Sequence, residues 1–296
     1  MSTFDTPEPI NVSIDLLAGD VRISASDRSD TVVVVSPTDG SNDSDVNVAE
    51  QTRVEYSNGT LVIKAPKPRY RAFSFRNSGS IDVTVELPAD SQVLGETSMG
   101  DFSTDGQLGE CRFVTGVGNI GLDKTGPLHL TTGTGRVTVG RTTGRTEVTG
   151  AGDVRIREID GPAVIKNLNG DTWVGAVTGD MRCNAANGNI SVDRAQATVS
   201  AKTANGDVRI GEIVRGSVVL STSYGELEIG IREGTAALLD VGTKFGNVRN
   251  SLAASDTPDS LHQKVEVRAR TSFGDIVIRR SNPFPYSGND QRGDTE

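Results

Sequence analysis

Carboxylates and amides recur directly after glycines along the chain, at a spacing that could support chemistry. Ten glycines from Gly100 to Gly274 open short runs of alternating apolar and polar residues. They follow one another at intervals of 17 to 21 residues until a final interval of 28. If the runs stack as neighbouring strands, Asp153 and Asp171 lie about 5 Å apart. That separation is typical of the two carboxyl groups of a retaining glycosidase.

Turn formation explains these residues better than catalysis or metal binding. Aspartate and asparagine begin strands after turns because they hydrogen-bond nearby backbone. A calcium-binding β-roll repeats Gly-Gly-x-Gly-x-Asp and supplies six to eight oxygens, whereas here one glycine usually precedes the acidic residue. We therefore expect no catalytic residue, no metal and no cofactor. Other side chains stand at the equivalent positions elsewhere: Asn119, Arg136, Asn189, Glu226 and Asn247.

The histidines and cysteines form no recognisable reactive motif. His129 alternates with apolar Leu128 and Leu130 and should face solvent, and no His/Cys pair has metal-ligand spacing. Cys111 and Cys183 fall at inward positions four repeats apart, about 19 Å, which is too far for a disulfide. We expect both thiols to be free.

A row of outward side chains forms the first candidate binding surface. The third residue after successive glycines reads Arg155, Trp173, Ser191, Arg209 and Glu228. Tryptophan and arginine are the residue types most enriched at interface anchors. The possible surface-binding patch is therefore Arg155, Trp173 and Arg209, although a covered strand ladder would have the same composition.

A basic, aromatic segment forms the second candidate. Residues 64–76 carry no acid. Such a composition can hold a nucleic acid or an anionic membrane, or it can simply clamp a loop onto the protein by its aromatic rings. The possible basic loop comprises Lys67, Arg69, Tyr70, Arg71 and Arg76.

The repeat itself predicts the fold. Each unit of about 18 residues contains two short strands with period-2 alternation and many β-branched residues. One unit cannot bury its apolar face alone, but stacked units bury a continuous core. The prediction is an all-β, β-solenoid-like stack of two-strand coils. No segment combines helical periodicity with capping signals, so we expect essentially no helix.

The amino-terminal third follows the same pattern less regularly. It is interrupted by an acidic insertion, Ser36–Glu50, and a basic one, Pro66–Ser80. We expect residues 1–95 to form an irregular β cap that continues the sheets, residues 96–280 the solenoid, and residues 281–296 a disordered tail. Ala253–Gln263 is expected to be a loop inserted in the last coil, which would explain the long final interval.

Composition restricts the partners and the compartment. The chain has 296 residues and a formal net charge of −9, and an acidic chain is a poor binder of polyanions. We therefore do not expect nucleic acid to be the partner. No apolar run reaches the ~20 residues of a transmembrane helix, and residues 1–11 do not resemble a signal peptide. The expected compartment is the cytoplasm.

Two stretches resemble a known bacterial family. Leu87–Asp90 (LPAD) and Glu96–Phe102 (ETSMGDF), followed by Gly-Asp-Val units, are similar to the putative-adhesin β-strand-repeat family, domain of unknown function family 4097. Gly19–Arg28 (GDVRISASDR) is similar to an actinobacterial branch of that family. The resemblance covers about Ile10 to Arg280. It implies a solenoid-like β fold and an adhesin-like role, and it brings no catalytic residues.

The sequence therefore predicts a non-enzymatic binding module or scaffold. Its partner would be a protein or a glycan surface, with self-association as a further possibility. Three alternatives stay open: a polymer-forming cytoskeletal scaffold like the bactofilins, a carbohydrate-active β-helix enzyme, and a membrane- or nucleic-acid-associated role through the basic loop.

Overall fold

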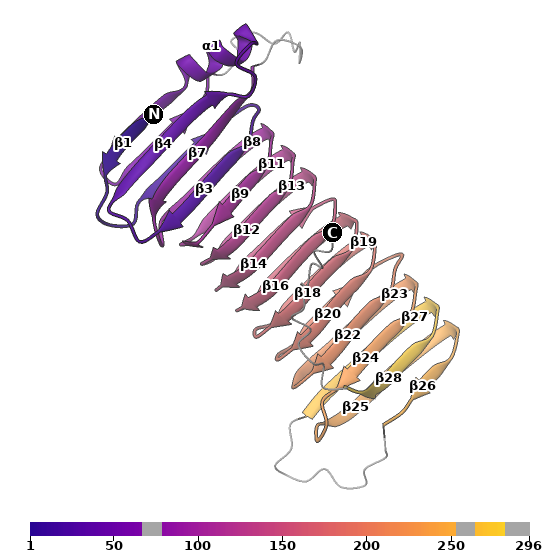
Figure 1. Ribbon diagram of the computed structural model, residues 1–296. Helices are drawn as coiled ribbons and strands as arrows, with labels where there is room; N and C mark the ends of the chain where they lie inside the picture. The colour runs from indigo at the N-terminus through magenta and orange to yellow at the C-terminus, as the bar shows by residue number, and fades with distance from the viewer. Residues whose placement is uncertain (67–78, 253–263, 282–296) are drawn as a thin grey trace, which may run out of the picture.

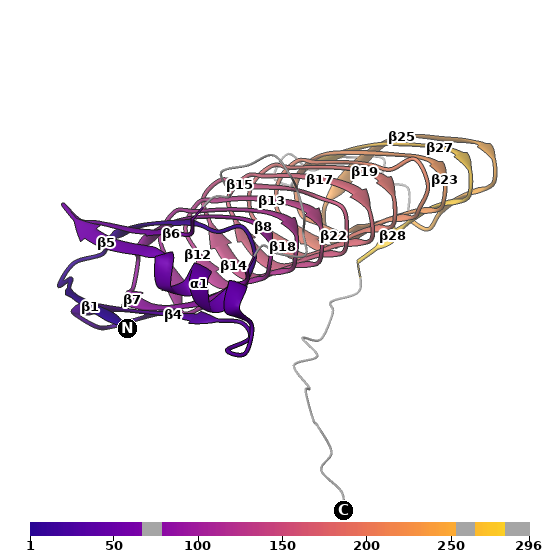
Figure 2. The ribbon, with the colours of Figure 1, turned by 90° about the horizontal axis from the view of Figure 1, so that it is seen from above.

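The chain forms a rod of two facing β-sheets (Figures 1 and 2). The structure is a computed structural model that describes residues 1–66, 79–252 and 264–281. Successive coils stack along the rod axis, and each contributes one strand to either sheet. The expected all-β, solenoid-like stack of two-strand coils is therefore confirmed.

The two sheets contain 15 and 13 strands and are called sheet A and sheet B. Sheet A has, in spatial order, β1 (Ser2–Asp5), β4 (Asp30–Pro37), β7 (Ile81–Pro88), β3 (Val21–Ser26), β9 (Phe102–Asp105), β12 (Ile120–Thr125), β14 (Val137–Thr143), β16 (Val154–Asp160), β18 (Thr172–Val177), β20 (Ile190–Ala195), β22 (Val208–Ile213), β24 (Leu227–Ile231), β28 (Ile276–Arg280) and β26 (Val248–Asn250), with β10 (Gln107–Leu108) beside β12. Sheet B has β25 (Ala236–Phe245), β27 (Lys264–Phe273), β23 (Gly216–Tyr224), β21 (Val199–Lys202), β19 (Met181–Asn187), β17 (Ala163–Asn169), β15 (Thr146–Gly150), β13 (Leu128–Thr134), β11 (Cys111–Val117), β8 (Gln92–Met99), β2 (Asn11–Asp15), β6 (Thr60–Lys64) and β5 (Arg53–Ser57).

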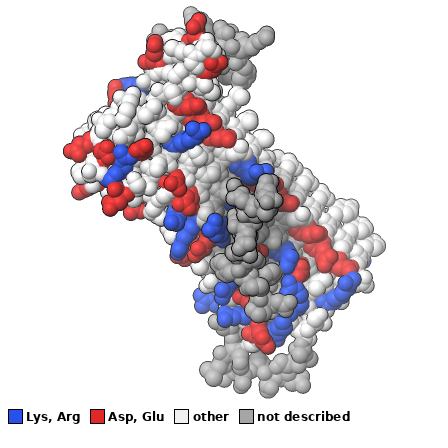
Figure 3. Space-filling model, in the orientation of Figure 1, with Lys and Arg blue, Asp and Glu red and all other residues white. Residues whose placement is uncertain are grey.

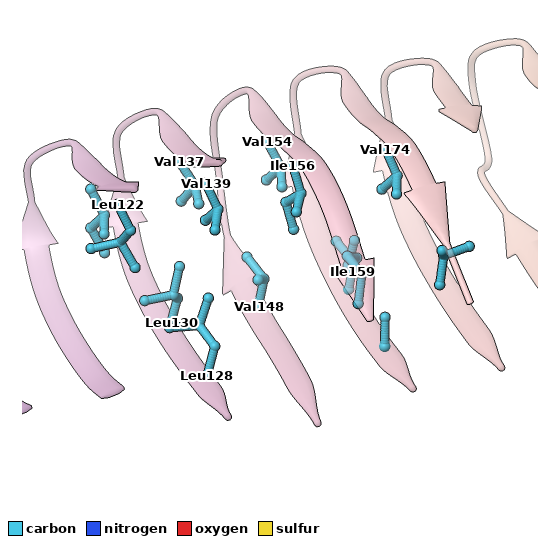
Figure 4. Close-up of a cluster of buried hydrophobic side chains, with 14 of the residues drawn as sticks. Leu122, Leu128, Leu130, Val137, Val139, Val148, Val154, Ile156, Ile159 and Val174 are labelled. Atoms are coloured by element: carbon cyan, nitrogen blue, oxygen red, sulfur yellow. The ribbon is translucent and has the colours of Figure 1, made fainter. Parts of the chain in front are cut away.

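The core lies between the sheets and is made of small and β-branched side chains. Leu128 and Leu130 of β13 face Val137 and Val139 of β14, and all four are buried (Figure 4). The next coils repeat this arrangement in parallel register. Because inward and outward residues alternate along every strand, the two-residue period of the sequence decides which side chains enter the core.

Glycines at one corner let the coils approach closely. Gly188 has φ +123°, and a Cβ there would lie 2.1 Å from the carbonyl oxygen of Gly170 in the preceding coil. A side chain at this position would therefore meet both backbone strain and a steric clash. The same requirement applies along the corner and explains the repeating glycine.

At each end of the rod, the order of the coils in space differs from their order in the chain. The outermost carboxyl-terminal coil is β25–β26, and the later coil β27–β28 lies between it and β23–β24. At the other end, β8 and β9 pair on the inner side of β2 and β3, while the β6–β7 coil lies on their outer side. The strands of residues 1–95 thus belong to the same two sheets, and the domain boundaries at 95 and 280 stay a prediction.

The expectation of no helix is wrong for one segment. The acidic insertion contains all but the last residue of α1 (Asp43–Gln51). Asn42 caps the amino terminus of this helix, and its side chain accepts a hydrogen bond from the Ser44 amide. Val48 and Ala49 of α1 pack against the core. The helix lies at the amino-terminal end of the rod (Figure 1) and, with the antiparallel strands β1, β4 and β5, forms an irregular cap.

Three expectations fall wholly or almost wholly outside the described residues. These concern the basic loop, with Lys67, Arg69, Tyr70, Arg71 and Arg76; the inserted loop Ala253–Gln263; and the tail, of which only Ser281 is described.

Candidate functional site

The register of sheet A places the candidate patch residues in one outward row. Arg155 of β16 pairs with Trp173 of β18, which pairs with Ser191 of β20, and Ser191 pairs with Arg209 of β22. Arg155 is therefore the direct neighbour of Trp173, whereas Arg209 lies two strands from it, about 10 Å along the sheet. Trp173 is half-buried rather than fully exposed.

A hollow of about 320 Å³ opens on this row. It combines an aromatic ring, a guanidinium, an amide, a carboxylate and two hydroxyls. The guanidinium of Arg155 has no ion-pair or hydrogen-bond partner among the residues that the structure describes. The lining residues are Arg155, Asp171, Thr172, Trp173, Asn189 and Ser191.

The indole of Trp173 is held in place by its neighbours. A Cβ on Gly175 would lie 3.2 Å from the indole Cη2, so the missing side chain makes room for the ring. Asp193 on β20 lies near the indole N–H. Partial desolvation raises the pKa of Asp193, and the nearby indole and the charge of Arg209 partly offset that shift. The ring at the border of the hollow is therefore surrounded by close neighbours.

Arg209 is committed to other side chains. Its Nε lies 3.3 Å from Glu228, which also binds Arg279 at 2.7 Å. Arg209 does not line the hollow. Acidic and basic side chains intermingle over the described part of this face (Figure 3). Of the three predicted patch residues, the structure therefore brings Arg155 and Trp173 together at one cavity and leaves Arg209 beside it.

The turn aspartates bind backbone of the next coil. Asp153 Oδ1 accepts a hydrogen bond from the Asp171 amide at 3.2 Å, and Asp171 Oδ1 accepts one from the Asn189 amide at 2.8 Å. Asn189 continues the chain of contacts to the Asp207 amide at 2.8 Å. These oxygens join one coil to the next rather than the two ends of a turn. Coil stacking thus explains their position.

A row of side chains along one corner of the coils was not predicted from the sequence. The residue before each repeat glycine points outward, and Tyr224, Phe273 and Phe245 form a continuous exposed stack there. Their ring centroids are 4.9 and 4.8 Å apart, with interplanar angles of 2° and 11°. Asn187 and Asn205 precede them in the same row and are joined by a 2.8 Å side-chain hydrogen bond. The signal was present in the sequence, because each aromatic directly precedes a repeat glycine.

The cysteines have no reactive environment. Cys111 and Cys183 are free and buried, as expected. Burial raises the pKa of both thiols to about 12. A thiol with such a pKa carries almost no thiolate at neutral pH, and the thiolate is the reactive form.

Two features are absent from the described residues: a cluster of metal ligands and a membrane-spanning helix. Within residues 1–66, 79–252 and 264–281, His, Cys, Asp and Glu side chains form no group that could hold a metal ion. In the same ranges, no helix is both long and apolar enough to cross a membrane.

Comparison with solved structures finds several bacterial chains of low identity. A putative lipid binding protein from Parabacteroides distasonis is 15% identical, with a TM-score of 0.48 over 77% of this chain and 95% of that one. A putative adhesin from Parabacteroides merdae is 14% identical, with a TM-score of 0.47 over the same shares. A putative adhesin from Bacteroides fragilis is 14% identical, with a TM-score of 0.36 over 94% of this chain and 95% of that one. At these values the likeness supports no statement about function.

Comparison by sequence identifies the family. No curated protein matches the chain. The model of the Toastrack DUF4097 family matches residues 11–279, which include the glycine repeat and most of the amino-terminal cap. This match confirms the family resemblance, while the actinobacterial branch stays a prediction. The chain belongs to the Toastrack DUF4097 family.

Proposed function

We propose that the protein is a non-enzymatic binding module that holds a glycan chain in the hollow on sheet A. The observation that carries this proposal is that Trp173 and Arg155 line the same open cavity. Among the described residues, the guanidinium of Arg155 forms no ion pair. Of the two partners expected from the sequence, a protein or a glycan surface, this proposal chooses the glycan.

The chemistry of the lining favours a sugar. An indole ring offers a rigid apolar surface for the C–H face of a pyranose ring. The hydroxyl of Ser191, the amide of Asn189 and the guanidinium of Arg155 can exchange hydrogen bonds with sugar hydroxyls. A few fixed polar groups around an aromatic wall are typical of small-ligand sites.

A catalytic role has no support in the arrangement of the carboxylates. Asp153 and Asp171 both accept backbone amides of neighbouring coils. A general acid or nucleophile needs a carboxyl group positioned on the substrate, whereas Oδ1 of both residues is held by the backbone of the next coil, and only Asp171 lines the hollow. Removing either carboxylate should therefore weaken coil stacking rather than abolish a reaction.

The single tryptophan provides a direct measurement. Because Trp173 is the only tryptophan in the chain, its fluorescence reports on the hollow alone. Titration with a panel of neutral and acidic oligosaccharides should change the emission saturably for at least one member, and calorimetry should give the same Kd. Trp173→Ala has no tryptophan emission, so its binding is measured by calorimetry. A Kd unchanged in this variant would contradict the proposal, as would no binding across the panel.

Two arginine variants form a matched pair for the same titration. Arg155→Ala should weaken binding about tenfold, because it removes a charged hydrogen-bond donor from the cavity wall. Arg209→Ala removes the same charge from the same row but outside the hollow, and it should leave the Kd within a factor of two. Equal losses in the two variants would show that net charge, not the hollow, governs binding.

A further inference from the structure

The carboxyl-terminal end of the rod presents two open sheet edges. In the described residues, β25 pairs only with β27, and β26 pairs only with β28. Each strand therefore has one side without a hydrogen-bonded neighbour among those residues. Free strand edges pair readily with other strands, and proteins usually blunt or cover them.

The same end exposes apolar side chains. Leu238 is 70% exposed and Phe245 is 64% exposed. Leu239 and Val241 point into the core from β25 but are only partly buried, because no further coil covers them. Phe245 stacks on Phe273 with one face. Its other face has no ring neighbour in the described residues.

The amino-terminal end differs because it is capped by a helix and short strands. There α1 lies against the core, and the outer strands run antiparallel to their neighbours. Phe4 of β1 and Tyr56 of β5 contact each other across the end, with ring centroids 5.6 Å apart. The strands β1 and β5 at this end are also paired on one side only, but they are short and carry charged side chains, which disfavours pairing with another strand. The two ends are therefore dissimilar, and the carboxyl-terminal end, with its long and apolar edge strand β25, is the one suited to extension.

A second copy of the same end fits this surface best. A two-fold axis along the sheet normal brings β25 against its own copy in antiparallel orientation and continues both sheets at once. In this arrangement, inward-facing residues of one copy must pair with inward-facing residues of the other. Odd-numbered positions of β25 can therefore pair only with odd-numbered positions, and even-numbered positions only with even-numbered ones. A foreign strand could extend only one of the two edges.

Charge selects one register among those allowed. With Gly242 on the two-fold axis, Asp240 of each copy lies opposite Lys244 of the other. Arg270 of its own chain binds Oδ1 of Asp240 at 2.6 Å, so Lys244 would approach a carboxylate that one cation already holds in place. This register gives two opposite-charge pairs across the strands, which stabilise a sheet, whereas a shift that places Asp240 on the axis would oppose like charges. It also brings Phe245 of each copy beside Leu238 and Leu239 of the other, which covers the exposed apolar surface.

We propose that two copies of this chain associate end to end through β25, antiparallel about Gly242, to form a closed dimer. Because the opposite ends of the rods are capped, association stops at two copies. The binding hollow on sheet A lies several coils away, so the dimer does not depend on the proposed glycan binding.

A cysteine on the two-fold axis tests the register in the full-length chain. Cα atoms directly opposite in an antiparallel pair are about 4.5–5.5 Å apart, which a disulfide can bridge. Gly242→Cys should therefore form a covalent dimer under mild oxidation. Lys202→Cys, on an outward position of β21 in the same sheet, should stay monomeric on denaturing gels. Equal cross-linking of both variants, or none at Gly242→Cys, would overturn the proposed register.

A charge variant tests the association without covalent chemistry. Sedimentation of the wild type across a concentration series should show a limiting mass twice the 31.2 kDa of the chain. Lys244→Glu should raise the dimer dissociation constant at least tenfold, while Lys202→Glu, with the same charge change, should leave it unchanged. A wild type that is monomeric at every concentration, or one that grows beyond the dimer, would overturn the proposal.

Discussion

At the scale of single residues, the corner glycines control how closely coils can stack. Replacing Gly188 with alanine should lower the free energy of unfolding by about 3 kcal/mol, because the added Cβ meets both an unfavourable φ and the Gly170 carbonyl. Urea unfolding followed by circular dichroism measures this loss as a lower midpoint.

Gly40 provides the control for that substitution. A Cβ at Gly40 has no atom within 4 Å, and its φ lies outside the positive range. Gly40→Ala should therefore change the stability by no more than about 0.5 kcal/mol. If the two variants shifted the midpoint equally, close approach at the corner would not be the reason for the repeating glycine.

At the scale of elements, α1 is attached to the rod through one buried carboxylate. Asp45 Oδ1 accepts the Ser80 amide at 2.9 Å, and Oδ2 accepts the Asp39 amide at 3.1 Å. Asp45→Ala leaves both amides without their acceptor and should cost about 2 kcal/mol. Hydrogen exchange at the amino-terminal cap should rise in this variant before exchange in the central coils does.

Asp43 in the first turn of the same helix separates this effect from a general one. It is exposed, so Asp43→Ala removes only a favourable charge near the helix amino terminus, worth about 0.5 kcal/mol. Exchange of the cap in Asp43→Ala should stay close to that of the wild type. A larger effect at Asp43 than at Asp45 would mean that the helix dipole, not the carboxylate contacts, holds α1 in place.

At the scale of the whole molecule, the reversed coil order predicts an unusual response to truncation. A chain ending at Ile231 removes the two outer coils together and leaves β24 and β23 as clean ends of the stack. A chain ending at Asn250 instead removes β27–β28 from between the coils that flank it. Limited proteolysis should find the shorter chain resistant, and residues 236–250 of the longer chain rapidly cleaved. Equal resistance of the two chains would mean that β25 and β26 dock directly on β23 and β24.

The sequence predicts the coil but not the order of coils. Glycine spacing and period-2 alternation fix which residues turn and which face the core, so the row from Arg155 through Trp173 follows directly. Every coil has the same pattern, however, and its edge is compatible with any other coil. The placement of β27–β28 inside β25–β26 therefore depends on connections and packing that no local signal records.

The helix and the aromatic stack were missed for different physical reasons. The helix is short and polar, and tertiary contacts such as those of Asp45 hold it in place, so it has no apolar stripe to detect. Tyr224 and Phe273 are 49 residues apart in the chain yet stack on each other, because the coils are out of order. At the hollow, Trp173 was identified from the repeat, but the separation of Arg209 from it depends on ion pairs that spacing cannot show.

The reversed order of the end coils also decides how the rod responds to force. The described chain leaves the sheet at Ser281, directly after β28, and β28 is hydrogen-bonded on both sides, to β24 and to β26. A pull on the carboxyl-terminal segment therefore cannot peel an outermost strand from a free edge. It must extract a strand from between two others and load both rows of hydrogen bonds simultaneously. This end of the molecule should therefore resist a higher force than a free edge strand would.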